Sequence, residues 1–135
     1  MYELVVEARF CAAHRLRDYE GQCERLHGHN YRVEVLLAGQ ELNPAGMLLD
    51  FKDASAIAEA AVRKLDHQYL NEIEPFDTSN PTAERIARHV ADEVAGRLPP
   101  GLTVKAVTCW ESDRCAARYL PQAGSMGRHP GERAR

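Results

Sequence analysis

Apolar and polar side chains alternate over the first part of the chain, from residue 2 to residue 10. The even positions are apolar, while Glu3, Glu7 and Arg9 fall between them. The same period returns from Tyr31 to Leu37, where the odd positions are apolar, and turn-forming residues follow at 43–46. A two-residue period is typical of a strand with one buried face, so the pattern predicts two strands.

Two stretches in the middle of the chain carry apolar residues at helical spacing instead. Asp50 is a suitable N-cap for the first, and the segment 80–82 starts the second, which stops at residues 99–101. The residues expected to face inward are Ala54, Ile57, Ala58, Ala61 and Leu65 in the first helix and Ala83, Ile86, Ala87, Val90 and Val94 in the second. Alternation returns over residues 102–111 and, more weakly, over 115–120, which predicts two further strands.

This order of elements, ββααββ, predicts the α+β class. Sequential strands favour antiparallel hairpins, so we expect a four-stranded antiparallel sheet with two helices on one face. At 135 residues the chain has the size of one domain, which we place at residues 1–120. Residues 121–135 offer almost nothing to bury and are expected to form a disordered tail.

Composition narrows the classes of function. The formal net charge is -3, so we expect no recruitment of nucleic acid or of an anionic membrane by the field of the whole protein. The first residues lack the basic leader and hydrophobic block of a signal peptide, and no stretch reaches membrane-spanning length. The cysteines form no CxxC pair, so free thiols and a cytoplasmic location are expected, with Cys11, Cys109 and Cys115 as small buried side chains.

Three histidines occupy strand positions that can bring them together. His27 and His29 share the parity of Tyr31, so they point to its face if the extended conformation continues back to them. His14 shares the parity of Phe10 in the same way. Three imidazoles with a vacant fourth position are the ligand set of a catalytic zinc ion, although nickel and iron also accept imidazole. The alternative is that His27 and His29 are loop residues and His14 is a core histidine.

Cys23 lies four residues before His27 in a polar loop, an unusual place for a structural cysteine. Near a metal cation and Arg25 its thiolate would be favoured, so it can act as a base or a nucleophile. Asp66 and His67 follow the first predicted helix, and a carboxylate beside an imidazole can form a proton relay. The alternative for this pair is a helix-end interaction with the helix dipole.

Glu111 ends the third predicted strand, on the face opposite Trp110. Its carboxylate could accept two parallel N–H donors, such as the amidine or guanidine edge of a heterocycle, or it could be a solvated strand-end residue. Of the remaining histidines, we expect His89 at the surface of the second helix and His129 in the tail.

Taken together, the motifs resemble the 6-pyruvoyl-tetrahydropterin synthase family, and most closely its bacterial 6-carboxy-tetrahydropterin synthase branch, which serves queuosine biosynthesis. The resemblance covers residues 4 to about 120. Six motifs occur in the order typical of the family: FCAAHRL, CERLHGHNY, GMLLDFKD, LDHQYLNE, NPTAE and CWES. The short CxxxHGH spacing resembles the carboxy branch more than the pyruvoyl branch.

The resemblance implies a role for each candidate residue. His14, His27 and His29 would hold zinc, Cys23 would be the general base, Asp66 and His67 would complete the proton relay, and Glu111 would anchor the pterin. It also implies the tunnelling fold, in which ββααββ subunits close into a barrel-like trimer. Two trimers would stack into a homohexamer, with active sites between subunits.

The implied substrate is a pterin triphosphate. The resemblance implies that 7,8-dihydroneopterin triphosphate becomes 6-carboxy-5,6,7,8-tetrahydropterin, with loss of triphosphate and acetaldehyde. Three alternatives stay open. A 6-pyruvoyl-tetrahydropterin synthase would eliminate triphosphate but retain the side chain, a non-catalytic zinc- or pterin-binding module would not need Cys23, and a zinc hydrolase would use Glu24 as its base.

Overall fold

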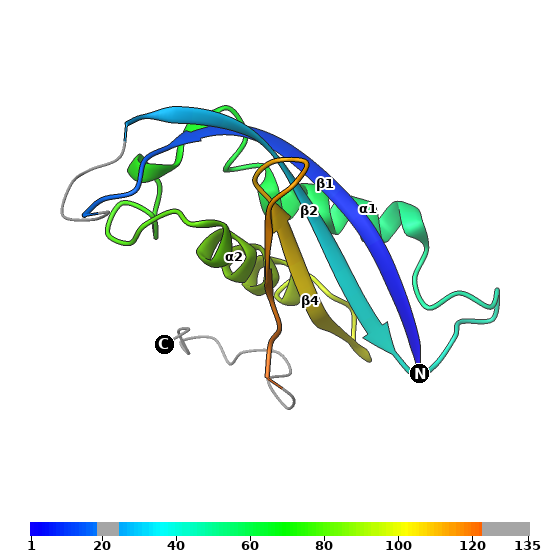
Figure 1. Cartoon of the computed structure of the whole chain (residues 1–135). Helices are drawn as coiled ribbons and strands as arrows, with labels where there is room; N and C mark the ends of the chain where they lie inside the picture. The colour runs from blue at the N-terminus through cyan, green and yellow to red at the C-terminus, as the bar shows by residue number, and fades with distance from the viewer. Residues whose placement is uncertain (19–24, 123–135) are drawn as a thin grey trace.

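The computed structural model describes residues 1–18 and 25–122 (Figure 1). Its elements follow one another as β1 (Tyr2–His14), β2 (His27–Gly39), α1 (Phe51–Val62), β3 (Gln68–Tyr69), the 3-10 turn η1 (Leu70–Glu72), α2 (Ala83–Ala95), β4 (Leu102–Trp110) and β5 (Ala116–Tyr119). The predicted α+β class and the ββααββ order of the larger elements are confirmed.

β1 and β2 form a long antiparallel hairpin, which Figure 1 shows as two strongly curved neighbouring strands. They pair from Tyr2 opposite Gly39 to His14 opposite His27. The predicted alternation is confirmed, because even positions of β1 from Val6 onward and odd positions of β2 from Tyr31 onward are buried. The inward face of the hairpin is therefore buried in the core along most of its length.

The sheet has five strands in the order β3-β1-β2-β4-β5. The expectation of a purely antiparallel four-stranded sheet is wrong in one respect, because the short β3 pairs with β1 in parallel, through Ala12 and Ala13. β3 is only two residues long, so it has no period that a sequence pattern could reveal. The other pairings are antiparallel, as predicted.

Both helices pack on the inward face of this sheet and share one core with it. α1 lies against β1, and α2 lies against β4 and β5. The predicted helix starts are confirmed: the Asp50 side chain, expected as an N-cap, accepts a hydrogen bond from Lys52 N, and Thr82, in the segment expected to start the second helix, caps α2 by accepting one from Arg85 N. Burial of the alanine-rich face of α1 and of Ile86, Val90 and Val94 in α2 fixes both helices on the sheet.

The outward face of the sheet is polar. Arg32 of β2 bonds to Glu34 at 2.7 Å and lies over the ring of Trp110, whose Nε1 donates to the same Glu34.

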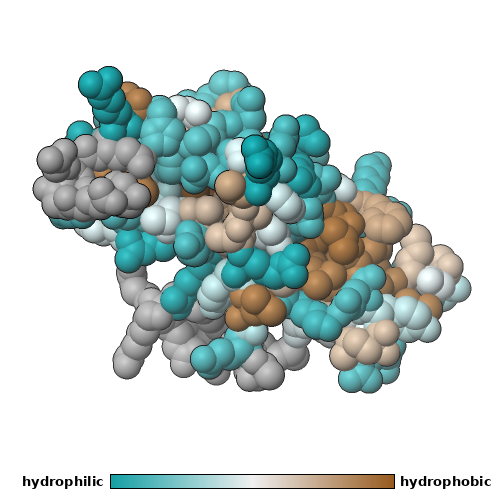
Figure 2. Space-filling view, viewed as in Figure 1, coloured by the Kyte–Doolittle hydropathy of each residue, from teal (hydrophilic) through white to brown (hydrophobic). Residues whose placement is uncertain are grey.

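Large apolar side chains are exposed at several places on the molecule, among them Tyr2, Val5, Leu42, Met47, Phe51 and Leu120. Figure 2 shows a hydrophobic area on the face in view. None of the helices in the described ranges is long and apolar enough to cross a membrane.

The expectations for three single residues need correction. Cys109 is buried as expected, but Cys11 and Cys115 are exposed because they lie on the outward face and in the turn before β5. His89 is not a surface residue: it is half-buried, with its ring 5.5 Å from that of Phe76. Cys23 and His129 lie outside the described residues, as does the tail from residue 123.

Candidate functional site

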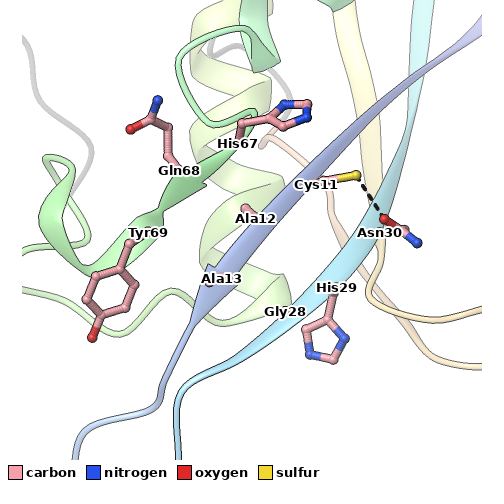
Figure 3. Close-up of a pocket in the computed structure, with 9 residues that line it drawn as sticks. All are labelled: Cys11, Ala12, Ala13, Gly28, His29, Asn30, His67, Gln68 and Tyr69. Atoms are coloured by element: carbon pink, nitrogen blue, oxygen red, sulfur yellow. Dashed lines mark hydrogen bonds between the residues drawn. The ribbon is translucent and has the colours of Figure 1, made fainter.

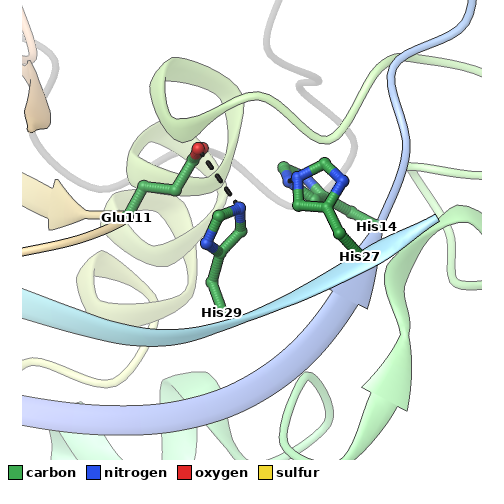
Figure 4. A group of neighbouring side chains, drawn as sticks. All are labelled: His14, His27, His29 and Glu111. Atoms are coloured by element: carbon green, nitrogen blue, oxygen red, sulfur yellow. Dashed lines mark hydrogen bonds and ion pairs between the residues drawn. The ribbon is translucent and has the colours of Figure 1, made fainter. Parts of the chain in front are cut away.

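Three histidines converge at the loop end of the β1–β2 hairpin, where β1 ends and β2 begins. His14 is the last residue of β1, its register partner His27 is the first of β2, and His29 follows two positions later on the same face. Together with Glu111 they form a cluster in which one ligand atom per residue lies within 4.8 Å of all the others (Figure 4). The strand parity read from the sequence therefore placed the three imidazoles correctly.

Backbone carbonyls fix the orientation of two of these rings. His14 Nδ1 lies 2.8 Å from Pro81 O, and His27 Nδ1 lies 2.8 Å from Arg25 O. A carbonyl oxygen can only accept, so each Nδ1 carries the hydrogen and each Nε2 is left with its lone pair in the neutral ring. Ligating histidines in metal sites are usually oriented by such a bond from the second ring nitrogen.

The two Nε2 atoms then face each other across 3.1 Å. Two lone pairs at this distance repel unless a proton or a metal cation lies between the rings. The donor set of three imidazoles and one carboxylate suits zinc and also other divalent transition metals. The residues present therefore fit a metal ion, and the cluster is able to hold one.

Glu111 joins the cluster from β4, the strand that pairs with β2. It is the first residue after β4, and its Oε1 lies 3.2 Å from His29 Nε2. The parity argument placed it opposite Trp110, and this is confirmed because Trp110 points outward to Glu34. Its position beside the histidines was not predicted. The strand register explains it: Trp110 of β4 pairs with Arg32 of β2, so the next residue, Glu111, points to the inward face close to His29.

The segment after His14 is clamped to the loop before α2. The Asn71 side chain accepts from Arg15 N and donates to Arg15 O, both at 2.9 Å. Asn80 repeats this pattern on Arg17, at 2.8 and 2.9 Å. The clamp holds the loop that carries Pro81, whose carbonyl orients His14. Sequence reasoning missed it, because Asn71 and Asn80 are distant from Arg15 and Arg17 in the chain.

The guanidinium of Arg17 strengthens the same clamp. It donates to the carbonyl oxygens of Phe76 at 2.9 Å, Asn71 at 3.1 Å and Ser79 at 3.4 Å. Arg17 is therefore occupied by the backbone of this loop. These bonds stabilise the path of the chain between η1 and α2 and, with it, the position of Pro81.

Asp66 and His67 lie at the sheet edge, beside the outward-facing Cys11. Asp66 Oδ1 accepts from Cys11 N at 3.0 Å and lies 2.9 Å from His67 Nδ1, while His67 N donates to Cys11 O at 2.6 Å. The hydrogen bond from Cys11 N is the main cause that lowers the pKa of Asp66; burial opposes it and His67 adds to it. His67 has a positive φ of 59°, a conformation that is uncommon for a residue with a side chain.

An open pocket lies beside this pair, between the β1–β2 hairpin and β3 (Figure 3). His67, Cys11 and Asn30 line it, and the Cys11 thiol donates to Asn30 Oδ1 at 2.8 Å. Figure 3 shows the rings of His67 and His29 on opposite sides of the hairpin. The structure thus brings His14, His27, His29 and Glu111 together but not the Asp66–His67 pair, and Cys23 lies outside the described residues.

Comparisons with known proteins give one consistent family. Residues 3–122 match the family described as 6-pyruvoyl tetrahydropterin synthase. A relative from Synechocystis sp., 36% identical over 89% of this chain and 94% of its own, is named 6-carboxy-5,6,7,8-tetrahydropterin synthase. Another from Pyrococcus furiosus, 32% identical over 82% of this chain and 90% of its own, is named dihydroneopterin monophosphate aldolase.

The fold is also similar to a solved structure of this family. The solved structure of a 6-pyruvoyl tetrahydropterin synthase from Caenorhabditis elegans superposes with a TM-score of 0.76 at 24% identity, covering 90% of this chain and 96% of that one. At this identity the likeness concerns the fold, and it confirms the tunnelling fold expected from the motifs.

Proposed function

The chain belongs to the 6-pyruvoyl tetrahydropterin synthase family, and we propose that it is a zinc-dependent 6-carboxy-5,6,7,8-tetrahydropterin synthase of queuosine biosynthesis. It is an enzyme, a lyase of the class that acts on dihydroneopterin triphosphate. Its product would be 6-carboxytetrahydropterin, released with triphosphate and acetaldehyde. Its relatives from Synechocystis and Bacillus subtilis carry the name of this activity, at 36% and 34% identity.

One observation carries the proposal: three imidazoles and a carboxylate converge, and carbonyl bonds leave two of the Nε2 lone pairs turned toward each other. His14, His27 and His29 would hold the zinc ion. When bound, it would supply Lewis acidity that polarises the substrate's side-chain hydroxyls and acidifies the neighbouring carbon. The three histidines also position the substrate's side chain at the end of the hairpin.

The remaining candidate residues would transfer protons or bind the pterin ring. Cys23 would take the proton from the carbon, and His67, oriented by Asp66, would exchange protons with the side-chain oxygens. The Glu111 carboxylate would accept the parallel N–H donors of the pterin ring. Glu111 lies beside the three histidines, so the ring anchor and the metal ligands would belong to one site.

We also propose that the active sites lie between subunits of a cytoplasmic homohexamer. Within the described residues, β3 and the Asp66–His67 pair cover β1 only from Cys11 to Ala13, so β1 before Cys11 is an open edge, and β5 is the edge on the other side. Open edges tend to pair with another chain. The exposed apolar side chains Val5 and Phe51 give such an assembly surface to bury.

A direct assay tests the activity. The zinc-loaded protein is incubated without oxygen with 7,8-dihydroneopterin triphosphate, and pterin mass and acetaldehyde are followed together. A carboxylated tetrahydropterin formed with equimolar acetaldehyde supports the proposal. A retained three-carbon side chain without acetaldehyde would assign the pyruvoyl activity instead, and unchanged substrate would favour a non-catalytic binding module.

The Pyrococcus furiosus relative makes aldol cleavage the second candidate. The same assay with 7,8-dihydroneopterin monophosphate separates it: efficient cleavage of the monophosphate, with no reaction of the triphosphate, would assign an aldolase. Cys23→Ala should abolish carboxytetrahydropterin formation, whereas Cys115→Ala, which removes an exposed thiol from the turn before β5, should leave it intact.

A further inference from the structure

Glu111 lies where two different partners compete for one carboxylate. Its Oε1 is 3.2 Å from His29 Nε2 and belongs to the cluster whose ligand atoms lie within 4.8 Å of one another. A metal ion held by the three histidines would therefore also be within reach of this oxygen. The pterin ring, in the function proposed above, needs the same carboxylate as its anchor.

Three imidazoles and a carboxylate complete a four-coordinate shell. A metal site closed by four protein ligands has no position left for a substrate, whereas a catalytic site keeps one open. If Glu111 stayed on the metal, the site could bind the ion tightly but could not engage the substrate's side-chain hydroxyls. An open fourth position for the substrate therefore requires the carboxylate to leave the metal.

The surroundings of Glu111 allow such a movement. Its backbone is held, because Glu111 N donates to Cys115 O at 3.0 Å across the turn between β4 and β5. Its side chain is 35% exposed, so the carboxylate can rotate on a fixed backbone without unpacking the core. His29, by contrast, is anchored within β2 and only 21% exposed.

We propose that Glu111 is an exchangeable ligand: it closes the metal site of His14, His27 and His29 in the substrate-free enzyme and transfers to the N–H edge of the pterin when substrate binds. This inference rests on the proposed function, since it requires that the site accepts a pterin. The exchange opens the fourth position only when the correct ring is present. It protects the metal from chance ligands at other times.

Thermodynamic linkage predicts the sign of the coupling between metal binding and pterin binding. A pterin ring that draws Glu111 away from the metal must weaken metal binding, and the metal must weaken binding of that ring by the same factor. The effect should be seen with a pterin that lacks side-chain hydroxyls, such as 6-methylpterin, because it takes the carboxylate and offers nothing to the metal in return. Glu111→Gln should abolish the coupling.

The test uses cobalt in place of zinc, because the visible absorption of cobalt(II) reports its ligands without any turnover. We expect Glu111→Gln to change the wild-type spectrum and to weaken zinc binding, measured by competition with a chelator, by roughly tenfold or more. Saturating 6-methylpterin should shift the wild-type spectrum toward that of Glu111→Gln and leave the variant's spectrum unchanged. Glu111→Asp, which keeps a shorter carboxylate, should give an intermediate zinc affinity.

Glu7→Gln is the matched control, since Glu7 is an exposed carboxylate on the outward face of β1. Its spectrum and zinc affinity should equal those of the wild type. Identical spectra and affinities for wild type and Glu111→Gln would overturn the proposal, as would a wild-type spectrum that 6-methylpterin does not alter. Turnover of dihydroneopterin triphosphate with either of these results would leave the proposed function standing, so the two failures are distinguishable.

Discussion

The histidines of this protein differ in what each ring can bind. His14 and His29 lie on the inward face of the hairpin, whereas His67 lies at the sheet edge with its side chain 80% exposed. Substitutions should therefore distinguish a metal ligand from a proton-transfer residue by their effect on zinc binding. Activity alone cannot distinguish them, because both kinds of residue would be essential for turnover.

We expect His29→Ala to bind zinc more weakly and to lose it to a chelator, because the ion loses one of its three imidazole ligands. His67→Ala should retain one zinc per chain while losing activity. The measurement is zinc content after gel filtration in a weak chelator, together with turnover. Loss of zinc from His67→Ala, or its retention at full affinity in His29→Ala, would contradict the assignment.

His89 gives the fold a dependence on pH that is independent of the metal site. Burial lowers its pKa from the ordinary value of 6.5, against the opposing influence of Glu93 and Asp92. The unfolded chain therefore binds more protons than the folded one as the pH falls below 6.5, so the free energy of unfolding decreases there. Above that pH the neutral ring is equally favoured in both states.

The His89→Gln variant should accordingly lose less stability than the wild type between pH 7 and pH 5. Urea unfolding of the metal-free proteins at several pH values measures the difference, and metal removal keeps ligand protonation out of the comparison. Parallel curves for the two proteins would show that the imidazole of His89 is not protonated on unfolding in this range.

At the scale of elements, the segment from η1 to the start of α2 supports the candidate metal site. The side-chain amides of Asn71 and Asn80 each make two hydrogen bonds to the backbone of the segment after β1, one to an N–H group and one to a carbonyl oxygen. Pro81 follows directly, and its carbonyl fixes the tautomer of His14. The position of this candidate metal ligand thus depends on side chains outside the histidine cluster.

We expect Asn80→Ala to destabilise the fold by about 1–3 kcal/mol, because the polar backbone groups of Arg17 lose their partners. It should also weaken zinc binding by roughly tenfold, as the loss of an orienting partner does in other metal sites. Asn43→Ala is the matched control: Asn43 Oδ1 accepts from Ala45 N and Met47 N in a turn between β2 and α1. It should lower stability without changing zinc affinity, and an equal loss of zinc affinity in both variants would refute the support role.

The elements also show which features a sequence can predict. The parity of Phe10 and Tyr31 extends through regular strands, so it located three histidines on one face correctly. The bond from His14 to Pro81 joins positions 67 residues apart, and the place of Glu111 depends on how β4 registers with β2. Such contacts are set by tertiary packing and leave no local period in the sequence.

At the scale of the whole molecule, the sheet separates the two halves of the proposed catalytic machinery. The rings of the histidine cluster are on the side that carries the helices, whereas the His67 ring lies on the other side of the hairpin and lines the pocket at the β3 edge (Figure 3). A single described chain therefore does not bring His67 to the metal ligands. Under the proposed assembly, a neighbouring copy that docks at the open edge would supply it, and each complete site would combine residues of two chains.

Mixed oligomers test this arrangement. His27→Ala lacks a metal ligand and His67→Ala lacks the relay imidazole, so each should be inactive alone. When the two are co-expressed with different tags and purified as a mixed assembly, some sites combine an intact cluster from one chain with His67 from the other. Random assembly of a ring predicts recovery of about one quarter of wild-type activity. Co-expression of His27→Ala with His29→Ala should restore nothing, because both chains lack the same half of the site. Recovery in neither mixture, from assemblies shown to contain both tags, would mean that metal cluster and relay belong to one chain.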